Sequence, residues 1–255
     1  MKLPGKSLGF LACGILLVLS GCATNSSFKV LRTNEWHKTA FVSASGNNLH
    51  ATKIGTTVFN NEFVQWYPQG QDLDALLSDA VEPVLMEFIH SEFVRDPADV
   101  DTLRQAQTQP FSPSAPFVLP QDYVSALLAN GFDSLVVAFP TKVNLSQQYD
   151  PHWYSGVGMM YRSFLNLHST YAVVAVELRF YDLEHPEIPP ASSRIYVEDM
   201  LEDFPWHTSW DEYTPEQKQF LLDSIIELVS DKLPEEVRRK LEPYLQAPAP
   251  QMGAK

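Results

Sequence analysis

Apolar residues recur with helical spacing in the segment that follows Asp72. Each lies three or four positions from another member of the set, which is Leu73, Leu76, Leu77, Ala80, Val81, Val84 and Phe88. This spacing places them on one face of an α-helix, and Asp72 is suited to cap the first turn. Pro83 lies inside the pattern and predicts a kink or a break, because proline removes one backbone hydrogen bond.

A second helical pattern lies near the carboxyl end of the chain. Thr214 and Gln217 match a capping box, in which each side chain bonds the backbone N–H of the other residue. Apolar positions follow at Phe220, Leu221, Ile225, Leu228 and Val229. Pro234 predicts the start of a short last helix, because proline suits the first helical position.

Strand patterns occupy the middle of the chain. Residues 135–139 are apolar at every position, which is typical of a strand buried on both faces. Residues 170–181 alternate instead, with four apolar side chains on one face: Val174, Val176, Leu178 and Phe180. Glu177 and Arg179 fall on the other face, so this strand is predicted to have one covered and one wetter face. Residues 193–198 alternate similarly.

Two further strands are predicted at residues 50–59 and 62–67, joined by a turn at Asn60 and Asn61. Residues 95–119 contain several Pro and Gln and predict a long loop.

Pro120 then predicts the first position of a helix, and Gly131 predicts its end.

The order of elements predicts an α+β fold with a mainly antiparallel or mixed sheet and helices packed on one face. Residues 30–245 are predicted to form a single domain, with a flexible tail at 246–255.

The first residues of the chain follow a different pattern. Lys2 and Lys6 precede an uncharged apolar run from Leu8 to Leu19. The run is about a dozen residues long, whereas a membrane-spanning helix needs roughly 20. A basic head, an apolar middle and a small-residue exit are typical of a secretory signal; a buried amino-terminal helix is the alternative.

The four residues Leu19-Ser20-Gly21-Cys22 resemble the lipobox of bacterial prolipoproteins at every position. In that family a diacylglyceryl group is attached to the Cys thiol, a peptidase cuts before the Cys, and the new amine is acylated. The resemblance implies a signal peptide at 1–21, a lipid anchor on Cys22 and a tether at 22–29. Ala23, where an Asp signals inner-membrane retention in enterobacteria, implies the outer membrane, with the domain facing the periplasm.

Charge and cysteine content fit this interpretation. Removal of Lys2 and Lys6 would change the net charge from −13 to −15, which argues against nucleic-acid binding and against electrostatic adhesion to anionic lipid. Cys13 would be removed and Cys22 lipidated, so the mature chain would have no disulfide. The domain must therefore be stabilised by its core alone, which a chain of this size can provide.

A second and weaker resemblance covers residues 115–200. A helix, the run Asn130-Gly131-Phe132-Asp133, a buried strand, the run 155–158 and a long strand look like the α+β domains of periplasmic envelope lipoproteins. The curli-secretion type and the amino-terminal domain of the Tol-system propeller protein are examples. Those domains assemble or dock protein complexes, and the resemblance implies a non-enzymatic envelope partner.

The sequence contains no strong catalytic or cofactor-binding motif. Outside the predicted signal peptide, a Gly-x-Ser-x-Gly elbow, a His-Glu-x-x-His motif, Cys/His zinc spacing and a phosphate-binding loop are all absent. The Gly-x-Gly at Gly156 and Gly158 lacks the third glycine of a nucleotide fingerprint and is interpreted as a turn between strands. Asp150 and His152 stand near Ser155, so a hydrolase using Asp150, His152 or His207 is one alternative function.

Residues 203–213 form the segment most suggestive of binding. Trp206, His207, Trp210 and Tyr213 are proposed as a partner-binding patch, because Trp and Tyr concentrate at interaction hot spots. Two alternatives stay open for this segment. The tryptophans could instead plug the end of the sheet next to Thr214, or His207 and Asp211 could bind a metal if the segment were helical.

The sequence therefore favours a non-enzymatic, lipid-anchored outer-membrane protein that binds or helps to assemble another envelope protein, without a cofactor. A small-ligand carrier, with Trp206 and Trp210 lining its pocket, is a further alternative.

Overall fold

A mixed sheet forms the centre of the structure, a computed structural model that describes residues 35–55, 60–95, 100–107, 119–144, 153–164 and 167–245. The described residues form nine strands. They are β1 (Lys38–Ser43), β2 (Leu49–Ile54), β3 (Glu62–Trp66), β4 (Glu92–Arg95), β5 (Ser134–Pro140), β6 (Lys142–Asn144), β7 (Trp153–Phe164), β8 (Leu167–Asp182) and β9 (Ala191–Leu201). The predicted signal peptide, Cys22, the tether and the tail lie outside the described residues.

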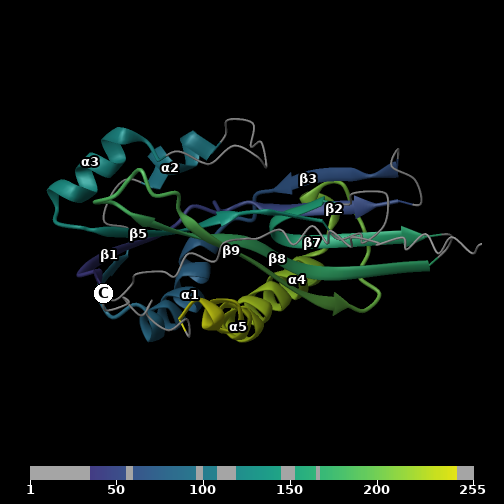
Figure 1. The fold of residues 1–255 in the computed structure, drawn as a ribbon. Helices are drawn as coiled ribbons and strands as arrows, with labels where there is room; N and C mark the ends of the chain where they lie inside the picture. Colours follow the sequence, from purple (N-terminus) through teal and green to yellow (C-terminus); the bar gives the residue numbers. More distant parts are fainter. Residues whose placement is uncertain are drawn as a thin grey trace, which may run out of the picture.

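The long strand β8 organises the sheet (Figure 1). One edge of β8 pairs with β9 over residues 170–180. The other edge pairs antiparallel with β7 up to Ala175 and with β5 from Val176 onward. Because β9 occupies one edge of β8, β7 and β5 share the other edge and lie end to end along it. The main order is β3-β2-β7-β8-β5-β1-β4, and β6 pairs with β7.

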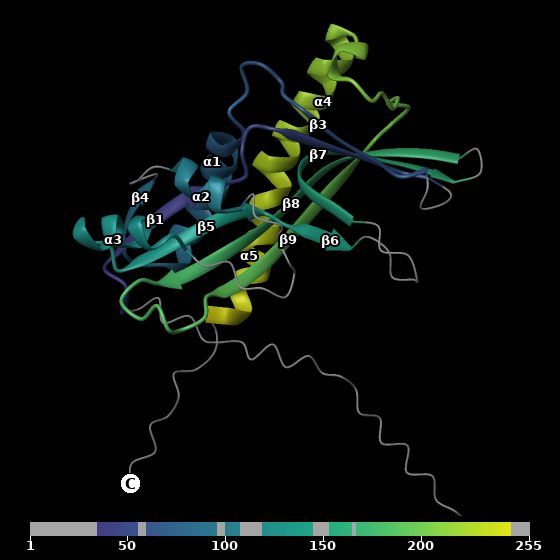
Figure 2. The ribbon, with the colours of Figure 1, turned by 90° about the horizontal axis from the view of Figure 1, so that it is seen from above.

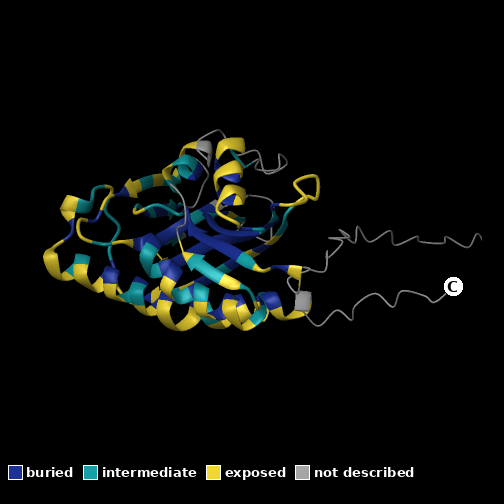
Figure 3. Cartoon of the chain, turned by 90° about the vertical axis from the view of Figure 1, so that its left-hand side faces the viewer, coloured by how far each residue is buried: buried dark blue, intermediate teal, exposed yellow. Residues whose placement is uncertain are grey.

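Three helices cover one face of the sheet: α1 (Leu73–Phe88), α4 (Pro215–Glu227) and α5 (Leu233–Leu245). A short π-helical segment at Leu228–Lys232 joins α4 to α5 without a break. The buried side chains of these helices share one large core with alternate residues of the central strands, as with Leu77, Ile225, Val174 and Val176. Figure 3 shows the buried strands at the centre and the exposed outer sides of the helices.

The opposite face is also covered at one end. There α2 (Val100–Gln107) and α3 (Gln121–Ala129) pack over β1 and β5, as Figure 2 shows from above. Leu103 and Leu127 share a second core with Leu135 and Val137 of β5. The predicted α+β class and mixed sheet are confirmed, and the structure adds a helical layer on the second face. Among the described residues, no helix is both long and apolar enough to span a membrane.

The predicted wetter face of β8 is a further difference from the sequence-based expectation. Glu177 and Arg179 are only 4% and 7% exposed. Their burial is tolerated because Arg179 Nε donates to Glu177 Oε1 at 2.9 Å, so neither charge is left unpaired.

The long patterned elements are where the sequence placed them, with small shifts. Asp72 caps α1 by accepting from the Ala75 N–H, and Thr214 and Gln217 form the capping box. Pro83 does not split α1, which continues through it with Val81, Val84 and Leu85 buried. Packing of that apolar face outweighs the lost hydrogen bond.

Other expectations were wrong. Residues 95–119 were predicted as a loop, but 100–107 form α2. Pro120 occupies the N-cap of α3 and not its first helical position, whereas Gly131 has the expected positive φ of 79° after the helix. Residues 155–158 lie inside β7 and not in a turn.

Candidate functional site

Trp66 is the centre of an aromatic cluster at one end of the sheet. Its ring centroid lies 6.2 Å from that of Trp206, 5.5 Å from Trp210 and 5.3 Å from Tyr213. The His207 ring meets Tyr213 edge-on at 4.6 Å. All four residues predicted as a patch are therefore brought together. We call Trp66, Trp206, His207, Trp210 and Tyr213 the aromatic cluster.

Hydrogen bonds fix the loop that carries this cluster. The Trp66 indole N–H donates to the Thr208 carbonyl at 3.2 Å. The Tyr213 hydroxyl donates to the Pro205 carbonyl and accepts from the His207 N–H at 3.0 Å. Burial raises the pKa of Tyr213 to about 12, so its hydroxyl stays protonated and keeps both bonds.

The geometry matches the packing alternative, in which the tryptophans plug the end of the sheet. Trp66 and Tyr213 are buried, and Trp206 and Trp210 are half-buried against the large core. A partner-binding role for the cluster stays a prediction. Thr208, in the loop that carries the cluster, is exposed to solvent and would be accessible to a partner.

The metal alternative has no geometric support in this segment. His207 precedes the short 3-10 helix Trp210–Glu212, so His207 and Asp211 do not share a helix face. His207 Nδ1 lies 3.4 Å from Glu212 Oε2 instead. Within the described ranges, no group of three or more His, Cys, Asp or Glu side chains is placed to hold a metal ion.

Trp66 is the member of the cluster that the sequence analysis missed. The alternation of the predicted strand 62–67 turns Val64 and Trp66 to one face and Phe63 to the other. This signal was readable, but it does not say which distant loop meets Trp66. That contact depends on the position of β3 at the edge of the sheet next to β2.

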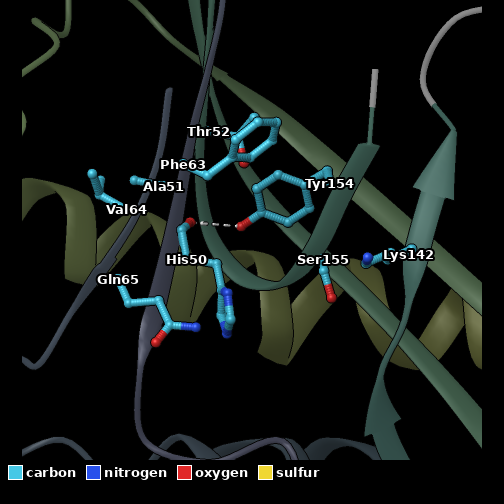
Figure 4. Close-up of a pocket in the computed structure, with 9 residues that line it drawn as sticks. All are labelled: His50, Ala51, Thr52, Phe63, Val64, Gln65, Lys142, Tyr154 and Ser155. Atoms are coloured by element: carbon cyan, nitrogen blue, oxygen red, sulfur yellow. Dashed lines mark hydrogen bonds between the residues drawn. The ribbon is translucent and has the colours of Figure 1, made fainter. Parts of the chain in front are cut away.

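A groove of about 570 Å³ lies on the other face of this end of the sheet (Figure 4). Strands β2, β3, β6 and β7 supply its lining, which consists of His50, Ala51, Thr52, Phe63, Val64, Gln65, Lys142, Tyr154 and Ser155. Figure 4 shows Phe63 and Gln65 on one side and Ser155 and Lys142 on the other, with His50 between them.

Two glycines allow β7 to approach His50 closely. Gly156 and Gly158 have φ of 84° and 152°. A Cβ on Gly156 would lie 2.7 Å from His50 Cδ2, and a Cβ on Gly158 would overlap the His50 carbonyl oxygen. The Gly-x-Gly run thus has a structural reason, which is to let β2 pair in parallel with β7 along one wall of the groove.

The polar groups of the groove are mostly neutral. The Tyr154 hydroxyl donates to the His50 carbonyl at 3.0 Å, and burial raises the pKa of Tyr154 well above its ordinary value. Burial lowers the pKa of His50, so its imidazole is uncharged at neutral pH. Among the described residues of the lining, Lys142 supplies the one full charge.

The described residues of the hydrolase alternative, Ser155 and His207, lie in different places. Ser155 lines the groove, but Asp150 and His152 lie outside the described residues, and His207 belongs to the aromatic cluster. A second cavity, of about 420 Å³, is lined by residues that include His168, Met200 and Pro205. Trp206 and Trp210 line neither cavity, so the predicted tryptophan-lined pocket is not among these two.

Comparison with known proteins does not place this chain in a family. No protein-family model matches it, and no curated protein matches it in sequence. The PelC dodecamer from Paraburkholderia phytofirmans is similar at 8% identity and a TM-score of 0.32, over 82% of this chain and 86% of that chain.

Two other solved structures match at a comparable level. Protein XCC0632 from Xanthomonas campestris is 7% identical, with a TM-score of 0.35, over 82% of this chain and 88% of that chain. The LpoB C-terminal domain from Salmonella enterica is 10% identical, with a TM-score of 0.26, over 63% and 82%. At these values we base no functional argument on the matches.

Proposed function

We propose that this protein is a non-enzymatic lipoprotein of the bacterial cell envelope, anchored to the outer membrane through Cys22. The observation that carries the proposal is the run Leu19-Ser20-Gly21-Cys22 behind a basic, then apolar, segment. Its α+β domain binds another envelope protein in the periplasm, and the outer side of the aromatic cluster is the contact surface.

The length of β8 supports this arrangement. The loop that carries the aromatic cluster, residues 203–213, is attached near the start of β8, where Thr170 Oγ1 donates to the Phe204 carbonyl at 2.7 Å. At the other end Asp182 pairs with Ser134, which pairs in turn with Thr39 of β1. Twelve residues of strand separate Thr170 from Asp182, or roughly 40 Å. An anchor on the amino-terminal side of β1 would therefore lie at the end of β8 opposite to the aromatic cluster.

Replacement of Cys22 tests the anchor. Cys22→Ala removes the thiol that would carry the lipid, so labelling with radioactive palmitate should disappear and the protein should leave the membrane fraction. Cys13→Ala is the matched control, because Cys13 lies in the predicted signal peptide and should leave both properties unchanged. If Cys22→Ala still takes the label and still sediments with membranes, the proposal is wrong.

A further inference from the structure

The groove beside His50 has the size of a small-molecule site. Its volume of about 570 Å³ lies within the range of roughly 300 to 1,000 Å³ typical of ligand pockets. Strand β3 forms one side of the groove and is an edge strand, and β6 and the start of β7 form the other.

One apolar side chain of the groove is left in water. Phe63 is 65% exposed, although its strand neighbours Val64 and Trp66 pack against the large core. The ring of Tyr154 is fully buried in the opposite wall. An exposed aromatic ring beside a concave surface is what an apolar ligand body would cover.

The charge of the groove is opposite to that of the whole chain. The chain has 31 Asp and Glu against 18 Lys and Arg, yet none of the nine lining residues is acidic. Glu62, next to Phe63 in sequence, is turned to the other face, where it pairs with Lys53 at 2.5 Å and with the Trp206 indole at 3.4 Å. Lys142 is exposed, and it forms no ion pair with any residue that the structure describes.

We infer that this groove binds a small organic monoanion with an aromatic or acyl body. Lys142 Nζ pairs with the carboxylate or sulfonate, and Phe63 covers the apolar body. The amide of Gln65, the hydroxyl of Ser155 and the imidazole of His50 are neutral hydrogen-bonding groups that orient the ligand without adding charge.

Titration with 1-anilinonaphthalene-8-sulfonate tests the inference, because this probe combines an aromatic body with one negative charge. Its fluorescence should report saturable binding to the full domain. Lys142→Gln should raise the apparent Kd about fivefold, which is the effect expected from the loss of one favourable ion pair. The uncharged probe N-phenyl-1-naphthylamine should bind both proteins equally, whereas Phe63→Ser should weaken both probes.

Two controls locate the binding. Lys218→Gln removes a lysine that lies 5.7 Å from the Trp210 ring, outside the groove, and should leave both probes unaffected. In NMR spectra the imidazole signals of His50 should shift on addition of the sulfonate probe, and those of His168 in the second cavity should not. Equal effects of Lys142→Gln and Lys218→Gln, or shifts at His168 alone, would overturn the inference. Both lysines are exposed or half-exposed, so thermal unfolding should confirm that the variants fold.

Discussion

Glu177 is a buried carboxylate with several cationic and polar neighbours. Its Oε1 accepts from Arg179, and its Oε2 accepts from Thr141 Oγ1 at 3.2 Å and from Arg194 at 3.4 Å. The Arg179 guanidinium also lies 5.4 Å from the Phe139 ring. Burial alone would raise the pKa of Glu177, but its bonds and charge interactions with the two arginines outweigh burial and lower it.

Glu177 should make the free energy of unfolding depend on pH in the acidic range. A carboxylate whose pKa is lower in the folded than in the unfolded state stabilises the fold above its unfolded pKa of about 4.5, and that stability is lost as the pH falls through the folded value. Glu177→Gln should therefore flatten the loss of stability below pH 4.5. At pH 7 it should cost about 3 kcal/mol, because Arg179 is left buried without its charge partner.

Urea unfolding of both proteins at pH 7 and at several values from pH 5 to pH 3 measures the two effects. Glu202→Gln, in an exposed position after β9, is the control and should change the stability by less than about 0.5 kcal/mol. An unchanged acid dependence in Glu177→Gln would show that other carboxylates dominate it.

At the scale of elements, strong periodicity was the reliable signal. The apolar face of 73–88, the capping box at Thr214 and the fully apolar run 135–139 were all predicted and found. The elements that were missed lack such a pattern. In α2, Leu103 is the one fully buried residue among those of residues 100–105, and β1 is buried at nearly all positions and too short to show alternation.

The strand β7 was missed for a different reason. Gly156 and Gly158 interrupt its alternation, and glycine in a sequence usually indicates a turn. Here a second strand, β2, approaches the glycine backbone so closely that side chains would not fit. Such an approach is a property of strand pairing and could not be predicted from residues 155–158 alone.

Gly158→Ala should consequently destabilise the domain. The new Cβ would overlap the His50 carbonyl oxygen in the neighbouring strand, which forces β2 and β7 apart, and we expect a loss of about 3 kcal/mol. Gly131→Ala is the matched control. Gly131 also has a positive φ, but its Cβ would meet no atom within 4 Å, so it should cost only about 1 kcal/mol from backbone strain. Chemical denaturation compares them, and equal losses would contradict the steric explanation.

At the scale of the whole molecule, the sequence predicted the class of fold but not its connectivity. Mixed or antiparallel pairing followed from alternation in residues 170–181, whereas the parallel pairs of β1 with β4 and β5 and of β2 with β7 join segments far apart in the sequence. The helical layer formed by α2 and α3 on the second face was likewise not predicted. For the candidate site, the structure brings the four predicted patch residues together and their binding role stays a prediction, whereas the positions of Trp66 and the groove depend on this connectivity.

The two ends of β8 offer a direct test of the proposed contact surface. A photoreactive benzoylphenylalanine at Thr208, beside the aromatic cluster, should crosslink to one envelope protein in intact cells, because Trp and Tyr are enriched in binding hot spots. Ile188 is the control. It is 41% exposed and lies in the connection between β8 and β9, at the opposite end of the sheet. An identical adduct at Ile188, or none at Thr208, would exclude this surface as the specific contact.

The central place of β8 also has a consequence for the order in which the chain folds. Without β8, the pairings that remain in the main path form two separate three-stranded units, β4-β1-β5 and β3-β2-β7. Neither unit can complete its core until residues 167–182 arrive and join them edge to edge. Folding must therefore wait for contacts between distant parts of the chain, which favours slow kinetics. Because the large core also contains residues of α4 and α5, it is completed only after nearly the whole chain has been made.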